Sequence, residues 1–162
     1  MAPPRSPSRT GRHTCADRPV CDIATVTYAG DRTPTETWQA LAADPRAVLV
    51  DVRTRAEWTY VGVPDLSSID RDVVRIEWLR FPDGAVNRHF VDELVAAGIE
   101  RDQPVHFLCR SGVRSVAAAE VASAAGWRRA YNVLEGFEGP HDSHHHRTVG
   151  GWKVAGLPWV QG

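Results

Sequence analysis

Residues 105–115 have the sequence Val105-His106-Phe107-Leu108-Cys109-Arg110-Ser111-Gly112-Val113-Arg114-Ser115. The short run from Val105 to Leu108 predicts a strand. The alanine-rich segment from Ser115 to Ala125 predicts a helix, which Gly126 ends. The sequence therefore predicts a strand, a short loop and a helix, with Cys109 at the carboxyl end of a central strand.

Strand and helix patterns alternate on both sides of this unit. Strands are expected at residues 23–28, 47–52, 73–79 and 130–134. Helices are expected between Thr33 and Pro45, at 55–61, and from Asn87 to Gly98, with capping boxes at Thr33 and Thr54. Residues 62–72 are expected to form a loop. Such alternation implies right-handed crossovers, so an α/β fold is predicted, with a mainly parallel five-stranded sheet between two layers of helices.

The composition limits the possible functions. The chain has 162 residues, with 19 Lys and Arg against 20 Asp and Glu, and a net charge of −1. That balance argues against nucleic-acid binding by the body of the protein. The longest strictly apolar run, Val116 to Ala119, is too short to cross a membrane. No glycine-rich phosphate-binding motif occurs, so no nucleotide cofactor is expected.

The first 21 residues differ from the rest of the chain. They are rich in arginine and proline and poor in apolar residues. Residues 1–21 are therefore predicted to be a disordered basic tail, and residues 22–162 the folded domain. The tail lacks the apolar stretch of a secretory signal, so the cytoplasm is the expected location, with an organellar transit peptide as the alternative. Cys15 and Cys21 are interpreted as free thiols rather than metal ligands or a disulfide.

Cys109 is the candidate nucleophile. The short loop up to Ser115 must curl so that several backbone N–H groups point inward, and Gly112 permits the necessary backbone angles. These N–H groups, the helix N-terminus and the guanidinium groups of Arg110 and Arg114 would converge on the sulfur. Such surroundings favour the thiolate over the thiol. The sequence thus predicts a reactive, solvent-facing cysteine.

The segment from Cys109 to Ser115 resembles the active-site loop of the rhodanese-like sulfurtransferases. Three further segments are similar to motifs of that family: Asp51-Val52-Arg53 with Glu57-Trp58, Asn132-Val133-Leu134-Glu135-Gly136-Phe137, and Gly150-Gly151-Trp152 through Trp159. The resemblance covers about residues 22–162. One departure is Gly62-Val63-Pro64-Asp65, where the family has a Gly-His-Ile-Pro-type turn.

The resemblance implies a rhodanese-like fold and sulfur transfer. Cys109 would take the outer sulfur of a small anionic donor such as thiosulfate and hold it as a persulfide, until a thiol, a thioredoxin-like protein or cyanide removes it. The residues implied to bind the donor are Arg110, Ser111, Gly112, Val113, Arg114 and Ser115. Asp51 would support the loop or cap the next turn. No cofactor and no metal are implied, and the expected state is a monomer or homodimer.

Other functions remain open for the same residues. A cysteine phosphatase or arsenate reductase needs five residues between its cysteine and arginine, whereas four separate Cys109 from Arg114. A rhodanese-like sulfur carrier or binding module with little turnover is the second alternative. The histidines at 141 and 144–146, with Asp142, are interpreted as a polar loop, and a metal site is the alternative. Among the tryptophans, Trp152 is expected to close over the site, and Trp38, Trp58 and Trp78 are expected in the core.

Overall fold

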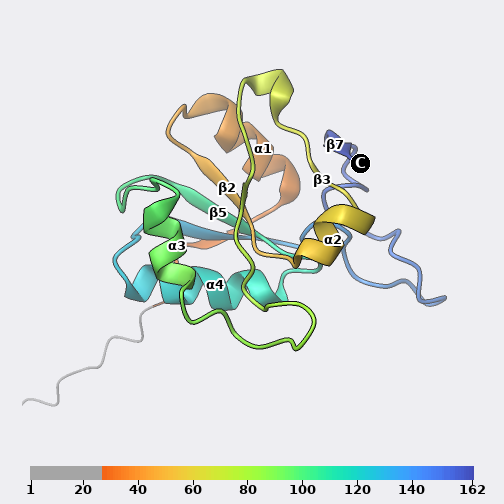
Figure 1. Ribbon diagram of the computed structural model, residues 1–162. Coiled ribbons are helices and arrows are strands. Elements are labelled where there is room, and N and C mark those ends of the chain that lie inside the picture. Colours follow the sequence, from red (N-terminus) through yellow and green to blue (C-terminus); the bar gives the residue numbers. More distant parts are fainter. Residues whose placement is uncertain (1–26) are drawn as a thin grey trace, which may run out of the picture.

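The structure is a computed structural model that describes residues 27–162 (Figure 1). Its strands are β1 (Gly30–Arg32), β2 (Val48–Asp51), β3 (Val63–Pro64), β4 (Val74–Arg75), β5 (Val105–Leu108), β6 (Ala130–Val133) and β7 (Trp159–Val160). Its helices are α1 (Pro34–Ala43), α2 (Arg55–Tyr60), α3 (Phe90–Ala96) and α4 (Val113–Ala124), with one 3₁₀ helix, η1 (Ser67–Ile69). The expected tail at 1–21, with its two cysteines, lies outside the described residues.

Five strands form one sheet in the order β1-β6-β5-β2-β4. All four neighbouring pairs are parallel, and β5 lies in the middle. Because the strands are parallel, their carboxyl ends meet at one edge, which is where open α/β sheets bind ligands. That edge brings together Asp51 at the end of β2, Cys109 after β5, and Asn132 near the end of β6.

Helices cover both faces of the sheet. On one face, Leu41 of α1 joins Leu49 of β2 and Leu108 of β5 in an apolar cluster. On the other face, Phe90 of α3 and Ala118 of α4 belong to a second cluster with the remaining apolar residues of β2 and β5. Both central strands are therefore buried on two sides, as is usual in parallel sheets. The predicted three-layer α/β/α fold with a mainly parallel five-stranded sheet is confirmed (Figure 1).

Two of the helices begin where the sequence predicts. Thr33 and Glu36 form a capping box at the start of α1, and Thr54 and Glu57 form another at the start of α2. In each box the threonine hydroxyl accepts a hydrogen bond from the glutamate N–H, and the glutamate carboxylate accepts one from the threonine N–H. Each box satisfies helix-terminal N–H groups that would otherwise lack partners.

The first strand differs from the prediction. Residues 27–29 are not in a strand, residues 23–26 lie outside the described range, and β1 occupies Gly30–Arg32 instead. Gly30 and Asp31 look like turn residues by propensity, but they pair with Tyr131 and Asn132 of β6. Pairing with a neighbouring strand outweighs propensity in so short an edge strand.

The third predicted strand is also shorter than expected. β4 contains only Val74–Arg75 of residues 73–79. Beyond it, the N–H groups of Ile76 and Trp78 still donate to carbonyl oxygens of residues 51 and 52, and the chain then turns back on itself through a bridge between Leu79 and Val86.

Two other elements also differ from the prediction. Helix α4 begins two residues before Ser115. The predicted loop at 62–72 contains β3, which pairs antiparallel with β7, as well as η1.

Trp152, expected to close over the site, is a core residue. It is fully buried in the cluster beside α1, where its ring packs edge-on against Trp38 and its Nε1 donates to the carbonyl of Pro158 at 2.8 Å. Trp78 packs against the opposite cluster as expected, whereas Trp58 lines a surface cleft. Within residues 27–162, no helix combines the length and apolar character needed to cross a membrane.

Candidate active site

Cys109 lies in the short connection between β5 and α4, at the carboxyl edge of the sheet. Its Sγ accepts a hydrogen bond from the backbone N–H of Gly112 at 3.1 Å. The hydroxyl oxygen of Ser115 lies 3.2 Å from the same sulfur. Gly112 has a φ of +102°, a backbone angle that strains any residue with a Cβ, so the curl of the loop requires glycine here. The loop therefore directs polar groups toward the sulfur.

The carbonyl groups of the loop are held by the segment after β6. The N–H groups of residues 137–139 donate to the carbonyl oxygens of Cys109 and Arg110 at 2.8 to 3.2 Å. Since C=O and N–H of a trans peptide point in opposite directions, the following N–H groups of the loop point away from that segment. The N–H groups of Val113 and Arg114, in the first turn of α4, have no acceptor within residues 27–162. These donors and the positive end of α4 make the loop suitable for an anion.

Cys109 is more deeply buried than the sequence predicts. The residue is 1% exposed and belongs to the apolar cluster that α3 and α4 cover. The end of a strand in a parallel sheet is expected to face solvent, but here Cys109 packs with the apolar residues of that cluster. The adjacent cleft, of about 270 Å³, is lined by Arg110, Arg114, the start of α2 and residues of the turn at 79–84. Cys109 itself is not among the residues that line this cleft.

A larger cleft also borders α2 but has a different lining. It measures about 590 Å³ and is lined by Arg55, Trp58 and Arg75, with residues of the chain's last segment. None of the residues from Cys109 to Ser115 contributes to it. The nucleophile is therefore associated with the smaller cleft, and size alone does not identify the site.

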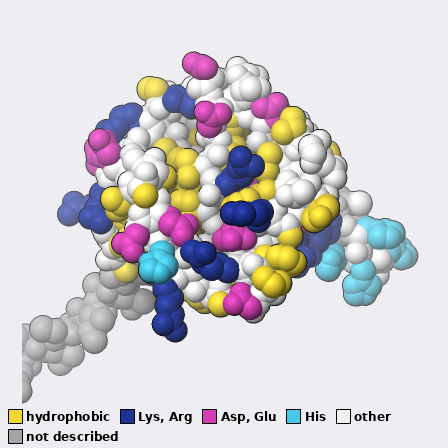
Figure 2. Space-filling view, in the orientation of Figure 1, with side chains coloured by type: hydrophobic (Ala, Val, Ile, Leu, Met, Phe, Trp, Pro, Cys, Tyr) yellow, Lys and Arg dark blue, Asp and Glu magenta, His cyan; other side chains and the backbone are white. Residues whose placement is uncertain are grey.

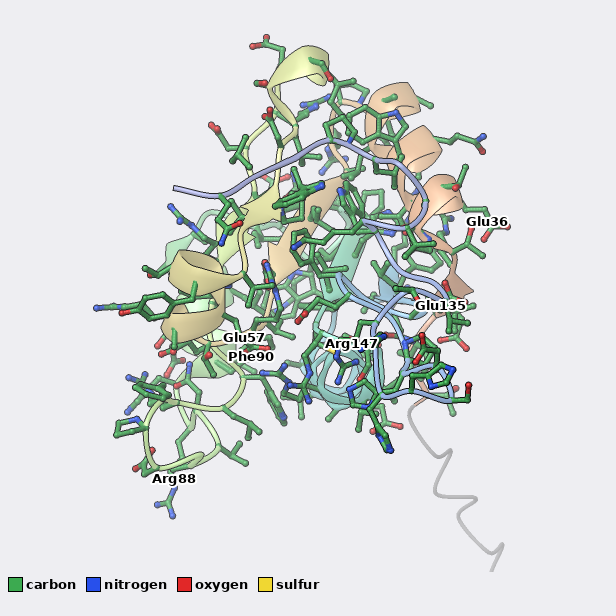
Figure 3. All side chains as sticks on the ribbon, turned by 90° about the vertical axis from the view of Figure 1, so that its right-hand side faces the viewer. Glu36, Glu57, Arg88, Phe90, Glu135 and Arg147 are labelled. Atoms are coloured by element: carbon green, nitrogen blue, oxygen red, sulfur yellow. The ribbon has the colours of Figure 1, made fainter. Side chains whose placement is uncertain are left out.

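Arg114 forms an ion pair with Glu57. Its two terminal nitrogens donate to the two carboxylate oxygens of Glu57 at 2.7 and 2.8 Å, and the two side chains are only 19% and 17% exposed. Burial alone would raise the pKa of Glu57, but hydrogen bonds from Arg114 and Thr54 outweigh it and lower that pKa to about 2. The hydrogen bond to Glu57 in turn raises the pKa of Arg114. Figure 3 looks toward this edge of the sheet and labels Glu57 at the start of α2.

The expected pair of free guanidinium groups is thus reduced to one. Arg110 is exposed and forms no ion pair within the described part of the chain. The apolar side chain of Val113 is 77% exposed, and the hydroxyl of Ser111 makes no hydrogen bond to Cys109 in the described part of the chain. Within residues 27–162, the loop therefore presents the unpaired cation of Arg110 and several backbone donors.

Ser115 is fully buried between two polar partners. Its Oγ lies 2.6 Å from Oδ1 of Asn132, in addition to its contact with the sulfur. The Nδ2 of Asn132 donates to a carboxylate oxygen of Asp31 at 2.8 Å. The sequence alone assigns neither Asn132 nor Asp31 to the site, although Asn132 begins one of the family-like segments. The missing information is the strand order, because β1 and β6 are placed beside β5 only by the fold.

Asp51 supports the framework of the site, as the resemblance implies, and also caps the following turn. Its buried carboxylate accepts hydrogen bonds from the backbone N–H and the guanidinium group of Arg53. The guanidinium group also donates to the carbonyl of Gly62 at 2.8 Å and lies 4.1 Å from the ring centre of Phe137. Because the N–H of Phe137 holds the carbonyl of Cys109, the Asp51–Arg53 pair connects β2 to the loop.

The histidine-rich loop is organised around a carboxylate. Asp142 Oδ1 accepts hydrogen bonds from the backbone N–H groups of His144 and His146, both at 2.8 Å. The side chains of the four histidines are exposed and project from one side of the molecule (Figure 2). Among residues 27–162, no group of three or more His, Cys, Asp or Glu side chains is arranged to hold a metal ion.

Comparisons with known proteins agree with this architecture. The family described as STR4 middle domain matches residues 29–162. Protein RC0915 of Rickettsia conorii is 35% identical over 126 residues, which cover 77% of this chain and 92% of that protein. The rhodanese-like domain-containing protein 4, chloroplastic, of Arabidopsis thaliana is 25% identical over 122 residues, which cover 75% of this chain and 23% of that protein.

Two solved structures share the fold. Rv0390 from M. tuberculosis has 57% sequence identity and a TM-score of 0.78, with 84% of this chain and 100% of that chain covered. The homodimeric polysulfide-sulfur transferase from Wolinella succinogenes has 21% identity and a TM-score of 0.53, with coverage of 82% and 78%. The second similarity concerns the fold alone.

A parallel sheet that carries a cysteine loop between its central strand and the next helix is typical of rhodanese-like domains, and the relatives confirm the resemblance to that class. Within that class, the chain belongs to the STR4 middle domain family. Its fold is that of a family of sulfurtransferase type.

Proposed function

We propose that the protein is a sulfurtransferase in which Cys109 accepts a sulfane sulfur and holds it as a persulfide. The observation that supports this proposal best is the loop around the sulfur. Gly112 donates its N–H to Sγ, and further N–H groups of the same loop, at the first turn of α4, have no acceptor in the described chain. Such donors stabilise negative charge on a thiolate and then on the outer sulfur of a persulfide.

Two displacements complete the reaction. In the first, the Cys109 thiolate attacks the outer sulfur of a donor such as thiosulfate. A new S–S bond forms, the S–S bond of the donor breaks, and sulfite leaves with the electron pair. In the second, a thiol, a thioredoxin-like protein or cyanide attacks the outer sulfur, and Cys109 leaves as a thiolate. Atoms and charges balance in both steps without a metal or cofactor, and each step is easier than direct transfer.

The loop residues divide the remaining tasks. Arg110, the free cation, would attract an anionic donor by charge-assisted hydrogen bonds. Arg114 would act indirectly, since its ion pair with Glu57 fixes the first turn of α4 against α2. Ser111, Gly112, Val113 and Ser115 would shape the pocket for the outer sulfur. A cytoplasmic location and a monomeric or homodimeric state remain predictions.

Intact-mass spectrometry tests the proposal directly. Incubation of the protein with thiosulfate should add one sulfur atom, and a cyanide chase should remove it with formation of thiocyanate. The Cys109→Ser variant should gain no sulfur. Absence of the mass gain in the unmodified chain, with Cys109 intact by alkylation, would contradict the proposal.

A sulfur carrier or binding module with little turnover is the second candidate, because Cys109 is only 1% exposed. Such a protein would load sulfur but release it to cyanide over many hours, or would not load it at all. Phosphatase chemistry fits less well, because the arginine of the loop is already paired with Glu57. Hydrolysis of p-nitrophenyl phosphate that depends on Cys109 would favour it.

A further inference from the structure

A line of hydrogen bonds runs from the sulfur of Cys109 to the surface. Ser115 Oγ lies 3.2 Å from Sγ and 2.6 Å from Asn132 Oδ1, and Asn132 Nδ2 donates to Asp31 at 2.8 Å. The hydroxyl of Tyr28 donates to the same carboxylate oxygen at 2.9 Å. Ser115 is 0% and Asn132 2% exposed, whereas Asp31 is exposed on β1. The line therefore connects a surface carboxylate to a buried sulfur through two buried side chains.

Asp31 fixes the direction of every bond in this line. An ionised carboxylate can only accept hydrogen bonds, so the amide nitrogen of Asn132 must face it. The amide oxygen of Asn132 is then turned toward Ser115, and this oxygen can also only accept. The hydroxyl proton of Ser115 must point at Asn132. Because a serine has a single hydroxyl proton, Ser115 offers Cys109 a lone pair and no donor.

This orientation affects the two charge states of Sγ differently. A protonated thiol can donate to the lone pair of Ser115, whereas a thiolate faces it without a hydrogen bond. Turning the hydroxyl toward the thiolate would leave the buried oxygen of Asn132 without a donor, and turning the amide would break its bond to Asp31. An unsatisfied buried polar group is costly, so both rearrangements are unfavourable.

We propose that Asp31 and Asn132 are positioning residues that act through Ser115 to disfavour negative charge on Sγ and so favour the sulfur-loaded state of Cys109. In the persulfide, Sγ carries no charge, and the negative charge lies on the outer sulfur, about 2 Å further along the S–S bond. Ser115 therefore opposes the free thiolate but not the loaded form. The part of this inference that concerns loading rests on the proposed function, and the part that concerns ionisation does not.

Other charged groups surround the loop and stay unchanged in the test. They are Arg110 and Arg114 on the loop and α4, Glu57 on α2, the Asp51–Arg53 pair at the end of β2, and Glu135 after β6. A variant of Asp31 or Asn132 alters none of these groups directly, so a changed sulfur reactivity would be transmitted along the line of hydrogen bonds.

The test is the rate of Cys109 alkylation by iodoacetamide as a function of pH. Asn132→Leu leaves Ser115 free to donate to the thiolate, so alkylation below the midpoint of the pH profile should become about tenfold faster, the factor expected for one net hydrogen bond. Asp31→Ala, a surface change, frees the amide to turn and should give about a threefold increase on the same basis. Asp72→Ala, which removes an exposed carboxylate outside the line, should leave the profile unchanged.

The background variant Ser115→Ala separates this mechanism from direct electrostatics. If Asp31 acts through Ser115, the effect of Asp31→Ala on the alkylation rate disappears in the Ser115→Ala background. An effect that persists there, or an unchanged profile in both Asp31→Ala and Asn132→Leu, overturns the inference. Loading is measured separately as the ratio of persulfide to free protein at fixed thiosulfate and sulfite, at a pH above the midpoint, where Asn132→Leu should lower the ratio about tenfold. If the unmodified protein takes up no sulfur, the proposed function fails. The alkylation rates still test whether Asp31 and Asn132 act on Sγ through Ser115.

Discussion

Replacing Glu57 by glutamine tests whether the charge of Arg114 is neutralised within the protein. In the structure, both carboxylate oxygens of Glu57 accept from Arg114, and Oε2 also accepts from the N–H of Thr54 at 2.9 Å. Glutamine retains an oxygen that can cap α2 but cannot carry the negative charge. The substitution therefore removes the ion pair while preserving the shape of the side chain.

The pKa of Glu57 gives the expected magnitude. It falls from the ordinary value of 4.5 to about 2, because the hydrogen bonds outweigh the opposing effect of burial. At about 1.4 kcal/mol per pH unit, this difference corresponds to about 3 kcal/mol of stability. A lowered carboxyl pKa stabilises the folded state when the group is ionised. The contribution is thus complete above pH 4.5 and is lost as the pH falls toward 2.

The assay is urea unfolding followed by tryptophan fluorescence between pH 7 and pH 2. Glu57→Gln should lower the free energy of unfolding by about 3 kcal/mol at pH 7, because it leaves Arg114 partly buried without its partner. The difference between the unmodified protein and the variant should shrink as the pH falls from 4.5 toward 2. Other titrating groups are common to both proteins and cancel in the difference.

An exposed ion pair provides the matched control. Arg46 and Asp102 also form a two-bond pair, but their side chains are 48% and 69% exposed, so Asp102→Asn should change the free energy of unfolding by less than about 1 kcal/mol at any of these pH values. An equal effect of Glu57→Gln at pH 7 and at pH 2 would contradict the predicted role of the charge. In that case Glu57 would act through packing or capping, and Arg114 would not depend on its charge.

Two further variants test the core and the backbone around the site. His106 is fully buried, and neither of its ring nitrogens has a hydrogen-bond partner among residues 27–162. Burial, with smaller effects of Arg32 and Arg129, lowers its pKa to about 3. Between about pH 6.5 and pH 3, only the unfolded state binds a proton at His106, so the free energy of unfolding should fall by about 1.4 kcal/mol for each unit by which the pH is lowered from 6 to 4. In urea unfolding, His106→Leu should remove this slope, whereas His89→Ala on the surface should retain it. Gly136 has a φ of +62°, and an added Cβ would lie 2.7 Å from the carbonyl carbon of Arg110, so Gly136→Ala should displace the loop and reduce sulfur loading in the mass assay. The reduction should be at least about tenfold. Gly98 has a similar φ of +76° but open space around an added Cβ, so Gly98→Ala should lose some stability and still load sulfur. Equal losses of sulfur loading in the two glycine variants would contradict the steric explanation.

The fold follows from local sequence signals where packing and propensity agree. The central strands are short apolar runs buried on both faces, and the capping boxes at Thr33 and Thr54 mark the starts of α1 and α2. Prediction fails where pairing over long sequence distances decides the structure. β1 forms from Gly30 and Asp31 because β6 offers them partners about 100 residues away, and β3 forms because β7 returns to it from the end of the chain.

At the candidate site, too, features that are local in the sequence are predicted, whereas contacts between distant residues are not. The sequence identifies Cys109, Gly112 and the start of a helix, because these features lie within a few residues of one another. It assigns Glu57 to the cap of α2, which is correct, but the second role of the same carboxylate as the partner of Arg114 requires contact across 57 positions. The burial of Cys109 likewise cannot be predicted from the sequence, since Cys109 belongs to an apolar cluster with residues of α3 and α4 that only the fold brings together.

The two ion pairs Asp51–Arg53 and Glu57–Arg114 determine where the positive potential at the sulfur originates. Arg53 is neutralised by Asp51 and Arg114 by Glu57, so neither guanidinium group contributes a free charge at the loop. What remains is Arg110, which is exposed and therefore screened by salt within about 10 Å at 0.1 M ionic strength. The N–H of Gly112, by contrast, is directed by the curl of the loop at the start of α4 and donates to a buried sulfur, where screening is weak. Arg110 would therefore govern how fast an anionic donor arrives, whereas the backbone would govern how firmly the transferred sulfur is held.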